Sequence, residues 1–219
     1  MRLKLRRWLY YYFSDHGLLR IFYSNLHRLP GNLYRSNQPS PRRLKILARR
    51  YGLKTVVNLR GGDSANPAWQ LEQEACKKLG LTMVDLRLFS RSFPYVEDVT
   101  NLKQVIETIE LPALVHCKSG ADRAGLFCVF YRHYRLGQPI KTALTELGLK
   151  YGHIKWARTG TLDQFFLEFL RDRHLKKGQG LLEWVRNDYD RQYLKLTRPE
   201  RGLIERLSNI LLDRILRRE

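Results

Sequence analysis

Apolar residues recur with two different spacings along the middle of the chain, and the two spacings alternate. Short apolar or β-branched runs predict strands at residues 32–35, 54–59, 81–88 and 113–116. Stretches with helical spacing separate them and predict helices at residues 41–51, 67–79, 96–109, 124–134, 139–149 and 161–173. Strands that alternate with helices predict an α/β fold in which helices flank a mostly parallel central sheet.

Capping signals support the ends of two of these helices. Ser40 stands at an N-cap position with Pro41 at the first helical position, and Gly52 follows the end of the same helix. Gly80 stands in the same place after the next helix. These residues predict sharp boundaries between the helices and the strands that follow them.

The ends of the chain differ from its middle in composition. Residues 1–30 mix Arg with Trp, Tyr, Phe and Leu and predict a basic amphipathic arm, residues 31–175 form the predicted domain, and residues 176–219 form a basic helical extension. In the last predicted helix one face is apolar, and we expect this stripe to dock on the domain, with a membrane or partner surface as the alternative. Its members are Leu203, Leu207, Ile210, Leu211 and Ile215.

The formal net charge is +19, and residues 1–50 carry twelve Lys and Arg against one acid, Asp15. Such a field concentrates polyanions, so phosphorylated substrates, nucleic acid and anionic lipid are candidate partners, with a merely solvated basic surface as the alternative.

Three scattered cysteines indicate a reducing compartment. The apolar run Trp8–Phe13 is too short to span a bilayer. We therefore expect a cytoplasmic protein with peripheral contact to anionic membrane.

The chemistry is concentrated in residues 116–123, which read H-C-K-S-G-A-D-R between a predicted strand and a predicted helix. A loop of backbone N–H groups at a helix N-terminus binds phosphate oxygens without a metal, and glycine permits the backbone angles of such a loop. Arg123 offers a planar fork for two phosphate oxygens, and the positive environment stabilises a Cys117 thiolate that can attack phosphorus. The predicted substrate-binding residues are Lys118, Ser119, Gly120 and Ala121.

The neighbouring residues are predicted to be structural. We expect His116 to hold the loop through hydrogen bonds and not to act as the attacking base. Cys128, flanked by Phe127 and Val129 on the following helix, is expected to be a buried, inert thiol, and Cys76 is expected to be structural rather than catalytic. For Cys117 an inert thiol is the alternative to the nucleophile.

Three segments together resemble the dual-specificity branch of the protein tyrosine phosphatase superfamily, in particular its atypical bacterial-type members. They are L-Y-R-S-N-Q-P-S (33–40), K-T-V-V-N-L-R (54–60) and L-V-H-C-K-S-G-A-D-R-A-G (114–125). The resemblance implies the cysteine phosphatase fold, no cofactor and no metal. It also implies hydrolysis of phosphate monoesters through a phosphocysteine, with Cys117 and Arg123 as the core catalytic pair.

Two positions depart from the pattern of that family. Ala124 stands where most members have Ser or Thr, and residues 88–94 hold no carboxylate where most members carry the general acid. Asp122, inside the loop, is the first candidate for the acid, because related phosphoinositide phosphatases use an Asp at this place. Asp98 and Glu97, at the start of the next helix, are further candidates, with N-terminal helix charges as the alternative, and Asp85, within a strand, is another, with a surface residue as the alternative.

Additional cations favour a strongly anionic substrate. Lys118 adds a charge inside the loop, and Arg91 and Arg60 add charges near the predicted site. Together they favour a phospholipid such as phosphatidylglycerophosphate, a phosphoinositide or an inositol phosphate, with phosphotyrosine or phosphoserine protein as the other class.

RNA 5′-triphosphatase, rhodanese-type sulfurtransferase and non-catalytic pseudophosphatase are competing functions. Nucleic acid is not expected as a partner, because no aromatic RNA-binding motif is present.

Overall fold

The computed structural model describes residues 7–11, 23–175, 178–198 and 202–210. Over these residues the chain folds as two compact units. The first comprises the residues up to Arg87 together with Ile109–Ala124, and the second comprises Leu88–Thr108 together with the residues from Gly125 onward. We describe each unit by itself.

The first unit is built on a five-stranded sheet with the strand order β1-β2-β5-β3-β4. Its strands are β1 (His27–Leu29), β2 (Leu33–Asn37), β3 (Thr55–Asn58), β4 (Thr82–Asp85) and β5 (Ala113–Cys117). Strand β1 pairs antiparallel with β2, and all the other pairings are parallel. Every residue of β2 and β5 is buried, as expected for central strands of a parallel sheet. The predicted mostly parallel sheet is confirmed.

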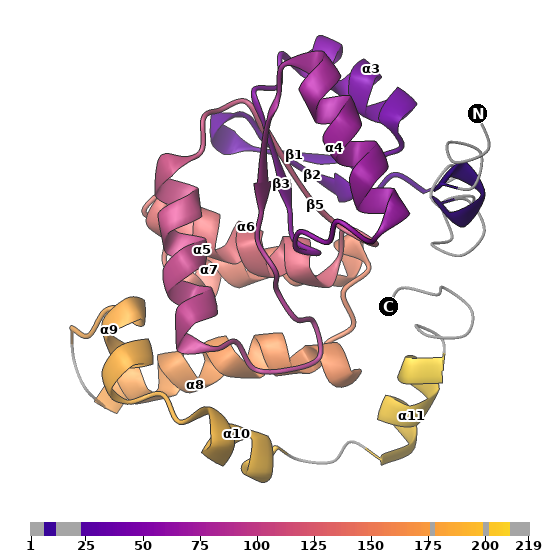
Figure 1. Ribbon diagram of the computed structural model, residues 1–219. Helices are drawn as coiled ribbons and strands as arrows, with labels where there is room; N and C mark the ends of the chain where they lie inside the picture. Colours follow the sequence, from indigo (N-terminus) through magenta and orange to yellow (C-terminus); the bar gives the residue numbers. More distant parts are fainter. Residues whose placement is uncertain (1–6, 12–22, 176–177, 199–201, 211–219) are drawn as a thin grey trace. The chain divides into compact units, whose positions relative to one another are not determined.

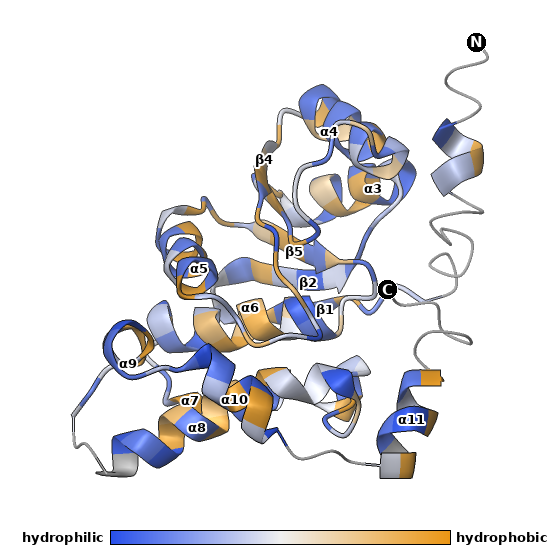
Figure 2. Ribbon diagram, turned by 60° about the horizontal axis from the view of Figure 1, so that its bottom comes forward, coloured by the Kyte–Doolittle hydropathy of each residue, from blue (hydrophilic) through white to orange (hydrophobic). Residues whose placement is uncertain are grey.

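Helices α3 (Pro41–Tyr51) and α4 (Pro67–Leu79) pack on one face of this sheet and against each other. Figure 2 shows hydrophobic and hydrophilic residues alternating around both helices, as expected for helices with one buried face. The Ser40 hydroxyl accepts a hydrogen bond from the backbone N–H of Arg43, and Gly52 adopts the left-handed conformation. The core between helices and sheet contains Tyr34, Leu44, Leu47, Leu53, Val56, Ala75, Cys76 and Leu114.

The second unit is helical (Figure 1). Its α-helices are α5 (Val96–Thr108), α7 (Ile140–Ala143), α8 (Thr161–Leu175), α9 (Leu181–Asn187), α10 (Arg191–Thr197) and α11 (Gly202–Ile210). Helix α6 (Asp122–Tyr134) begins in the first unit and continues in the second. Aromatic rings form much of this unit's core, with Phe165 centred 5.6 Å from Trp184 and 5.0 Å from Phe166.

The C-terminal extension holds the segment that precedes α5, within the same unit. The hydroxyl of Tyr189 donates to the carbonyl of Pro94 at 2.8 Å, and Nε of Arg191 donates to the carbonyl of Phe93 at 2.9 Å. The Arg191 guanidinium also lies 3.8 Å from the centre of the Tyr95 ring. Phe93 and Pro94 end the stretch without a carboxylate, so its last residues are held by Tyr189, between α9 and α10, and by Arg191, the first residue of α10.

Three predicted elements differ from the structure. Residues 27–29, expected in the arm, form β1, because the turn Pro30–Asn32 reverses the chain with left-handed backbone at Gly31 and Asn32. The helix predicted over residues 139–149 is wrong in length: α7 ends at Ala143, a 3-10 turn follows at Leu144–Glu146, and Gly148, with an extended backbone (φ −126°, ψ 160°), separates this turn from the next at Leu149–Tyr151. The strand predicted over residues 81–88 is the shorter β4, followed by a single bridge between Arg60 and Arg87.

Only part of each terminal extension is described. Residues 1–6 and 12–22 of the predicted arm lie outside the described residues, whereas residues 7–11 form a helical turn whose Tyr11 packs on Ala68 and Leu71. In α11 the three described residues of the apolar stripe, Leu203, Leu207 and Ile210, are exposed, so their predicted docking is wrong. Leu211 and Ile215 lie outside the described residues. Within the described ranges, no helix combines the length and apolar character needed to cross a membrane.

Candidate active site

The carboxyl ends of the three parallel strands β2, β5 and β3 bring the site together within the first unit. In the sheet register Cys117 lies opposite Asn37, and His116 lies opposite Asn58. Parallel strands end at the same edge, so the segments that follow β2, β3 and β5 meet there. The loop 118–121 leaves β5 at this edge, and α6 begins at its end with Asp122.

Four consecutive carbonyl groups of this loop accept hydrogen bonds from outside it. The carbonyl of Lys118 accepts from the backbone N–H of Gln38 at 3.4 Å, and that of Ser119 accepts from Nδ2 of Asn25 at 3.1 Å. Nη2 of Arg35 donates to both of the next two carbonyls, those of Gly120 and Ala121, at 2.9 Å each.

This arrangement orients the amides of the loop. The C=O and N–H of a planar trans peptide point in opposite directions. Carbonyls held by outside donors therefore turn the N–H groups of residues 119–122 toward the inside of the loop. In agreement, the N–H of Gly120 points to Sγ of Cys117 at 3.2 Å.

Gly120 is required both for its conformation and for space. Its φ of 76° lies in the left-handed region that favours glycine. A Cβ atom at this position would lie 2.6 Å from the carbonyl carbon of Ser36 and 2.7 Å from the amide nitrogen of Asn37. The loop thus approaches the end of β2 too closely for any side chain.

A buried carboxylate lies beneath the loop. Oε1 of Glu72, on α4, lies 2.7 Å from Nε2 of His116, and both side chains are almost fully buried. The other carboxylate oxygen accepts from Nε2 of Gln38 at 2.9 Å. The amide oxygen of Gln38 in turn accepts from Nη1 of Arg60. Glu72 therefore connects the residue before Cys117 to the segments after β2 and β3.

The loop residues predicted from the sequence occupy one turn of chain. Cys117, Ser119, Gly120, Ala121 and Asp122 are buried, with Asp122 only 3% exposed. Lys118 and Arg123 are partly exposed. Because α6 begins at this loop, the positive end of its dipole faces the space that the loop encloses, which favours an anion there.

The more distant candidates divide between the two units. Arg60 donates a hydrogen bond to the side chain of Gln38, whose backbone N–H in turn donates to the carbonyl of Lys118 in the loop. Asp85 is exposed at the end of β4, where it accepts from Nδ2 of Asn58 at 2.7 Å and from Nε1 of Trp69 at 2.9 Å. Arg91 and Asp98 belong to the second unit.

Asp98 has a structural contact of its own in the second unit. Its carboxylate accepts from the backbone N–H of Tyr95 at 3.0 Å, next to the start of α5. Burial raises the pKa of Asp98, while this hydrogen bond and the nearby Arg191 act in the opposite direction. These contacts are those of a helix-capping carboxylate.

The three cysteines lie in different surroundings. Burial, with smaller contributions from the carboxylates of Glu72 and Asp85, raises the pKa of Cys76 to about 12. Cys76 therefore stays a neutral thiol at physiological pH, packed in the core between α3, α4 and the sheet. Cys128 is buried in α6. Only Cys117 lies at the loop.

Arg35, Glu72 and Asn25 were not recognised from the sequence. Arg35 counted only as one of many basic residues, although its side chain is fully buried. Glu72 lies in a helix among other polar residues, and Asn25 lies in the segment predicted as an arm. The one available signal was the 33–40 motif, which contains Arg35. Across the residues described, no three His, Cys, Asp or Glu side chains come together as a metal site.

Comparison with known proteins matches this region. A family described as a DSP-PTPase phosphatase fused to NAD⁺ kinase matches residues 27–157. The dual specificity protein phosphatase TpbA of Pseudomonas aeruginosa strain PAO1 is 35% identical over 123 residues, which are 56% of this chain and 53% of that protein. The same protein of strain UCBPP-PA14 is 33% identical over 124 residues. The chain therefore spans about half the length of these curated relatives.

Solved structures support the fold. The crystal structure of P. aeruginosa TpbA aligns with a TM-score of 0.51 and 24% identity, covering 68% of this chain and 89% of that chain. A mutant form of Tk-PTP aligns with a TM-score of 0.52 and 22% identity, covering 67% and 97%. At this level of identity the likeness concerns the fold alone.

Proposed function

Since the chain belongs to the family of dual-specificity phosphatase domains described as fused to NAD⁺ kinase, we propose that it is a cysteine phosphatase that hydrolyses phosphate monoesters. The observation that carries the proposal is the set of four loop carbonyls held by Gln38, Asn25 and Arg35. It leaves a preorganised ring of N–H groups around Cys117. Such a ring stabilises the equatorial oxygens of a transferring phosphoryl group without reorganisation.

Arg123 and the start of α6 complete the proposed phosphate site. The guanidinium of Arg123 matches two phosphate oxygens, and the helix dipole adds a fixed positive charge. Arg35 contributes a second guanidinium from beneath the loop, at the carbonyls of Gly120 and Ala121. These positive groups also stabilise Cys117 as the thiolate, which is the nucleophilic form.

The proposed reaction has two steps. In the first, Sγ of Cys117 forms a bond to phosphorus as the ester P–O bond breaks, and the leaving oxygen takes a proton from a general acid. In the second, water attacks the phosphocysteine, releasing inorganic phosphate and regenerating the thiolate, while the acid recovers its proton. Ala124 offers no hydroxyl for the second step.

We assign the acid to Asp122. Its carboxyl is part of the loop, one residue from Arg123, and is buried. The two other candidates have different partners: Asp85 accepts hydrogen bonds from Asn58 and Trp69, and Asp98 accepts from the backbone at the start of α5. Position within the loop therefore supports Asp122 above both.

We propose a strongly anionic substrate, namely a phospholipid, a phosphoinositide or an inositol phosphate. Lys118 lies within the loop, and Arg60 is linked to it through Gln38, whose N–H donates to the carbonyl of Lys118. Two cations beside the phosphate site favour a substrate with charge beyond the reacting phosphate. Phosphorylated protein is the second candidate, supported by the relative named a dual specificity protein phosphatase.

A phosphate-release screen tests both parts of the proposal. The purified chain, without added metal, is assayed on p-nitrophenyl phosphate, phosphatidylglycerophosphate, phosphoinositides, inositol phosphates and phosphotyrosine or phosphoserine peptides. We expect turnover of the aryl phosphate that is abolished in Cys117→Ser, and the highest kcat/KM on a lipid or inositol substrate. Full activity of Cys117→Ser would overturn the mechanism, and a higher kcat/KM on phosphopeptides would overturn the substrate class.

The competing functions give different results in the same screen. Phosphate binding without turnover of any substrate would indicate a pseudophosphatase. Release of the γ-phosphate from 5′-triphosphate RNA, together with salt-sensitive RNA binding, would indicate an RNA 5′-triphosphatase. Turnover of thiosulfate would indicate a sulfurtransferase.

A further inference from the structure

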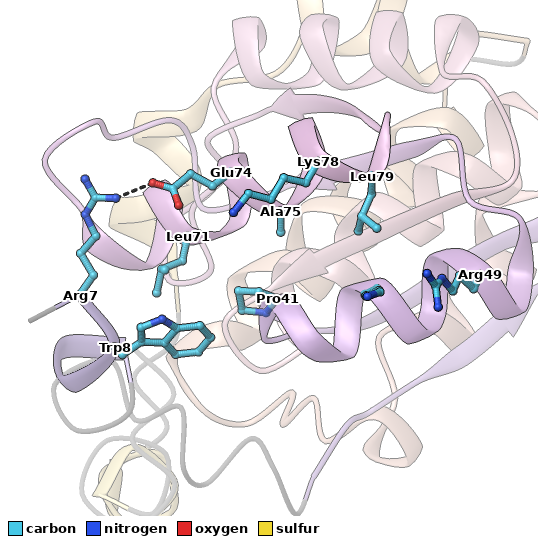
Figure 3. A pocket seen from close by; sticks show the side chains of 10 residues that line it. Arg7, Trp8, Pro41, Arg49, Leu71, Glu74, Ala75, Lys78 and Leu79 are labelled. Carbon is cyan, nitrogen blue, oxygen red and sulfur yellow. Dashed lines mark hydrogen bonds and ion pairs between the residues drawn. The ribbon is translucent and has the colours of Figure 1, made fainter. Parts of the chain in front are cut away.

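A pocket of about 410 Å³ lies between the exposed sides of α3 and α4 in the first unit (Figure 3). The helical turn of residues 7–11 closes one end of it, where Trp8 faces Leu71. None of its lining residues belongs to the loop of Cys117. They are Arg7, Trp8, Pro41, Lys45, Arg49, Leu71, Glu74, Ala75, Lys78 and Leu79.

The charged residues of this pocket are four cations and one carboxylate. The carboxylate, Glu74, accepts from Nη1 of Arg7 at 2.5 Å and is therefore neutralised. Lys45, Arg49 and Lys78 have no ion-pair partner within the described part of the chain, and all three are exposed. The whole of α3 carries basic residues and no acid. The pocket is therefore an uncompensated positive site.

Apolar and aromatic side chains form the rest of its wall. Trp8 packs edge-on against Tyr11 with a centroid separation of 6.1 Å, and Tyr11 is buried against Ala68 and Leu71 of α4. The Trp8 ring is thus anchored to the helix. Isolated lysines and arginines on a surface are usually only solvated, but here they line one pocket together with apolar side chains. Cavities of this size bind ligands of headgroup size.

Large apolar side chains are exposed on two of the three elements that line the pocket, the helical turn of residues 7–11 and α3. Leu9 and Tyr10, next to Trp8, are 48% and 37% exposed, and Ile46, on α3, is 49% exposed. Cations beside exposed apolar and aromatic groups form the combination that favours the interface of an anionic membrane, where tryptophan and tyrosine are enriched. A soluble anion would use the cations but not these side chains.

We propose that this pocket binds the phosphorylated headgroup of an anionic phospholipid at a membrane surface. Lys45, Arg49 and Lys78 contact the phosphate, while Trp8 and the exposed apolar residues contact the glycerol and upper acyl region. The site is separate from the catalytic loop, so it does not rest on the proposed phosphatase activity.

Vesicle binding tests the proposal. The full chain is sedimented with phosphatidylcholine vesicles with and without phosphatidylglycerol, at constant ionic strength. We expect binding only to the anionic vesicles. The combined variant Lys45→Gln, Arg49→Gln, Lys78→Gln should lower the affinity about a hundredfold, since each basic side chain near an anionic surface contributes a factor of about five. Equal binding to both kinds of vesicle would overturn the proposal.

A matched control separates the pocket from the general positive charge of the chain. The variant Lys141→Gln, Arg173→Gln, Lys195→Gln removes the same charges from exposed positions of the second unit. It should change the affinity much less than the pocket variant, and an equal loss would overturn the proposal. Circular dichroism checks that both variants fold. Single charge reversals, Lys78→Glu against Lys141→Glu, repeat the comparison if either triple variant does not fold.

The source of the phosphate group is distinguished by soluble competitors. Glycerol phosphate and inorganic phosphate should displace the protein from vesicles only weakly, because they lack the acyl region. Tight binding of glycerol phosphate that the pocket variant loses, without vesicle binding, would show that the ligand is a soluble anion. Binding of an RNA oligonucleotide with the same dependence on the pocket, and no vesicle binding, would likewise overturn the lipid assignment.

Discussion

Oε1 of Glu72 lies 2.7 Å from Nε2 of His116, and neither side chain has more than 2% of its surface exposed. The two residues join α4 to the end of β5 directly before Cys117. A carboxylate buried to this degree needs partners: Gln38 donates a hydrogen bond to its second oxygen, and a ring nitrogen of His116 lies within ion-pair distance of the first. The support of the loop therefore depends on a helix that contributes no residue to it.

Glu72→Ala should destabilise the protein. Removal of the Glu72 side chain leaves the buried amide of Gln38 and the ring of His116 without their carboxylate neighbour, and polar groups left unsatisfied in the interior cost about 2 kcal/mol. Urea unfolding would measure the loss. The control is Glu107→Ala, which breaks the half-exposed pair with Lys103 on α5 and should cost about 0.5 kcal/mol or less. Similar losses in the two variants would contradict a supporting role for Glu72.

Arg35→Lys should weaken phosphate binding. A lysine ammonium lacks the planar guanidinium that donates from Arg35 to the carbonyls of Gly120 and Ala121. The loss of one charged hydrogen bond, about 2 kcal/mol, corresponds to roughly a thirtyfold weaker inhibition by phosphate or vanadate. Arg28→Lys, at an exposed arginine that bonds Asn32, should leave the inhibition unchanged. Equal inhibition of both variants would refute the orienting role of Arg35.

Gly120→Ala should destabilise the fold and abolish phosphate binding. The new Cβ would meet backbone atoms of β2 at 2.6–2.7 Å, in addition to the cost of a left-handed alanine, for a combined loss of about 3 kcal/mol. Gly137→Ala is the matched control, because Gly137 has a φ of 66° with nothing within 4 Å of its Cβ position. It should cost about 1 kcal/mol. Thermal unfolding of both variants, with phosphate titration, measures the difference.

Asp122→Asn should slow substrates according to their leaving group. If Asp122 donates the proton, the kcat for an alkyl phosphate should fall about a hundredfold, because its alkoxide leaving group needs a proton. The kcat for p-nitrophenyl phosphate should fall much less, because p-nitrophenolate leaves without one. Asp98→Asn should show no such dependence, because Asp98 caps α5. Steady-state kinetics on the two substrates measures the ratio. An equal loss on both substrates would assign Asp122 a structural role.

Cys76 should resist alkylation by iodoacetamide at neutral and mildly alkaline pH. Burial raises its pKa to about 12, so the thiol stays neutral while Cys117 reacts. The unfolded thiol has a pKa of 9.0, so between about pH 9 and 12 the unfolded state loses a proton that the folded state keeps. This contribution to stability therefore falls as pH rises, and Cys76→Ala should remove that part of the alkaline loss. Peptide mass spectrometry measures which cysteine is alkylated, and urea unfolding at different pH values measures the stability. Alkylation of Cys76 ahead of Cys117 would contradict the expected resistance of Cys76.

Local sequence signals predicted most of the helices and strands and the position of the loop, because each depends on a short stretch of chain. The signals at Ser40, Gly52 and Gly80 predicted helix ends that the structure confirms. The alternation of strands and helices predicted the mostly parallel sheet. The order of residues 116–123 predicted a strand, a loop and a helix in succession: Cys117 ends β5, Gly120 lies in the loop, and Arg123 lies in the first turn of α6.

The residues that support the loop come from distant parts of the chain and are known only from the folded structure. Arg35 reaches carbonyls 85 and 86 positions away, and Asn25 reaches one 94 positions away. Hydrophobic periodicity does not distinguish a buried arginine from the many exposed ones of a basic chain, because burial depends on how the strands pair. The same holds for Glu72 beneath His116 and for the pocket between α3 and α4. Hydrophobic periodicity records which face of an element is covered, whereas the partners of its polar groups are fixed only when distant segments pack together.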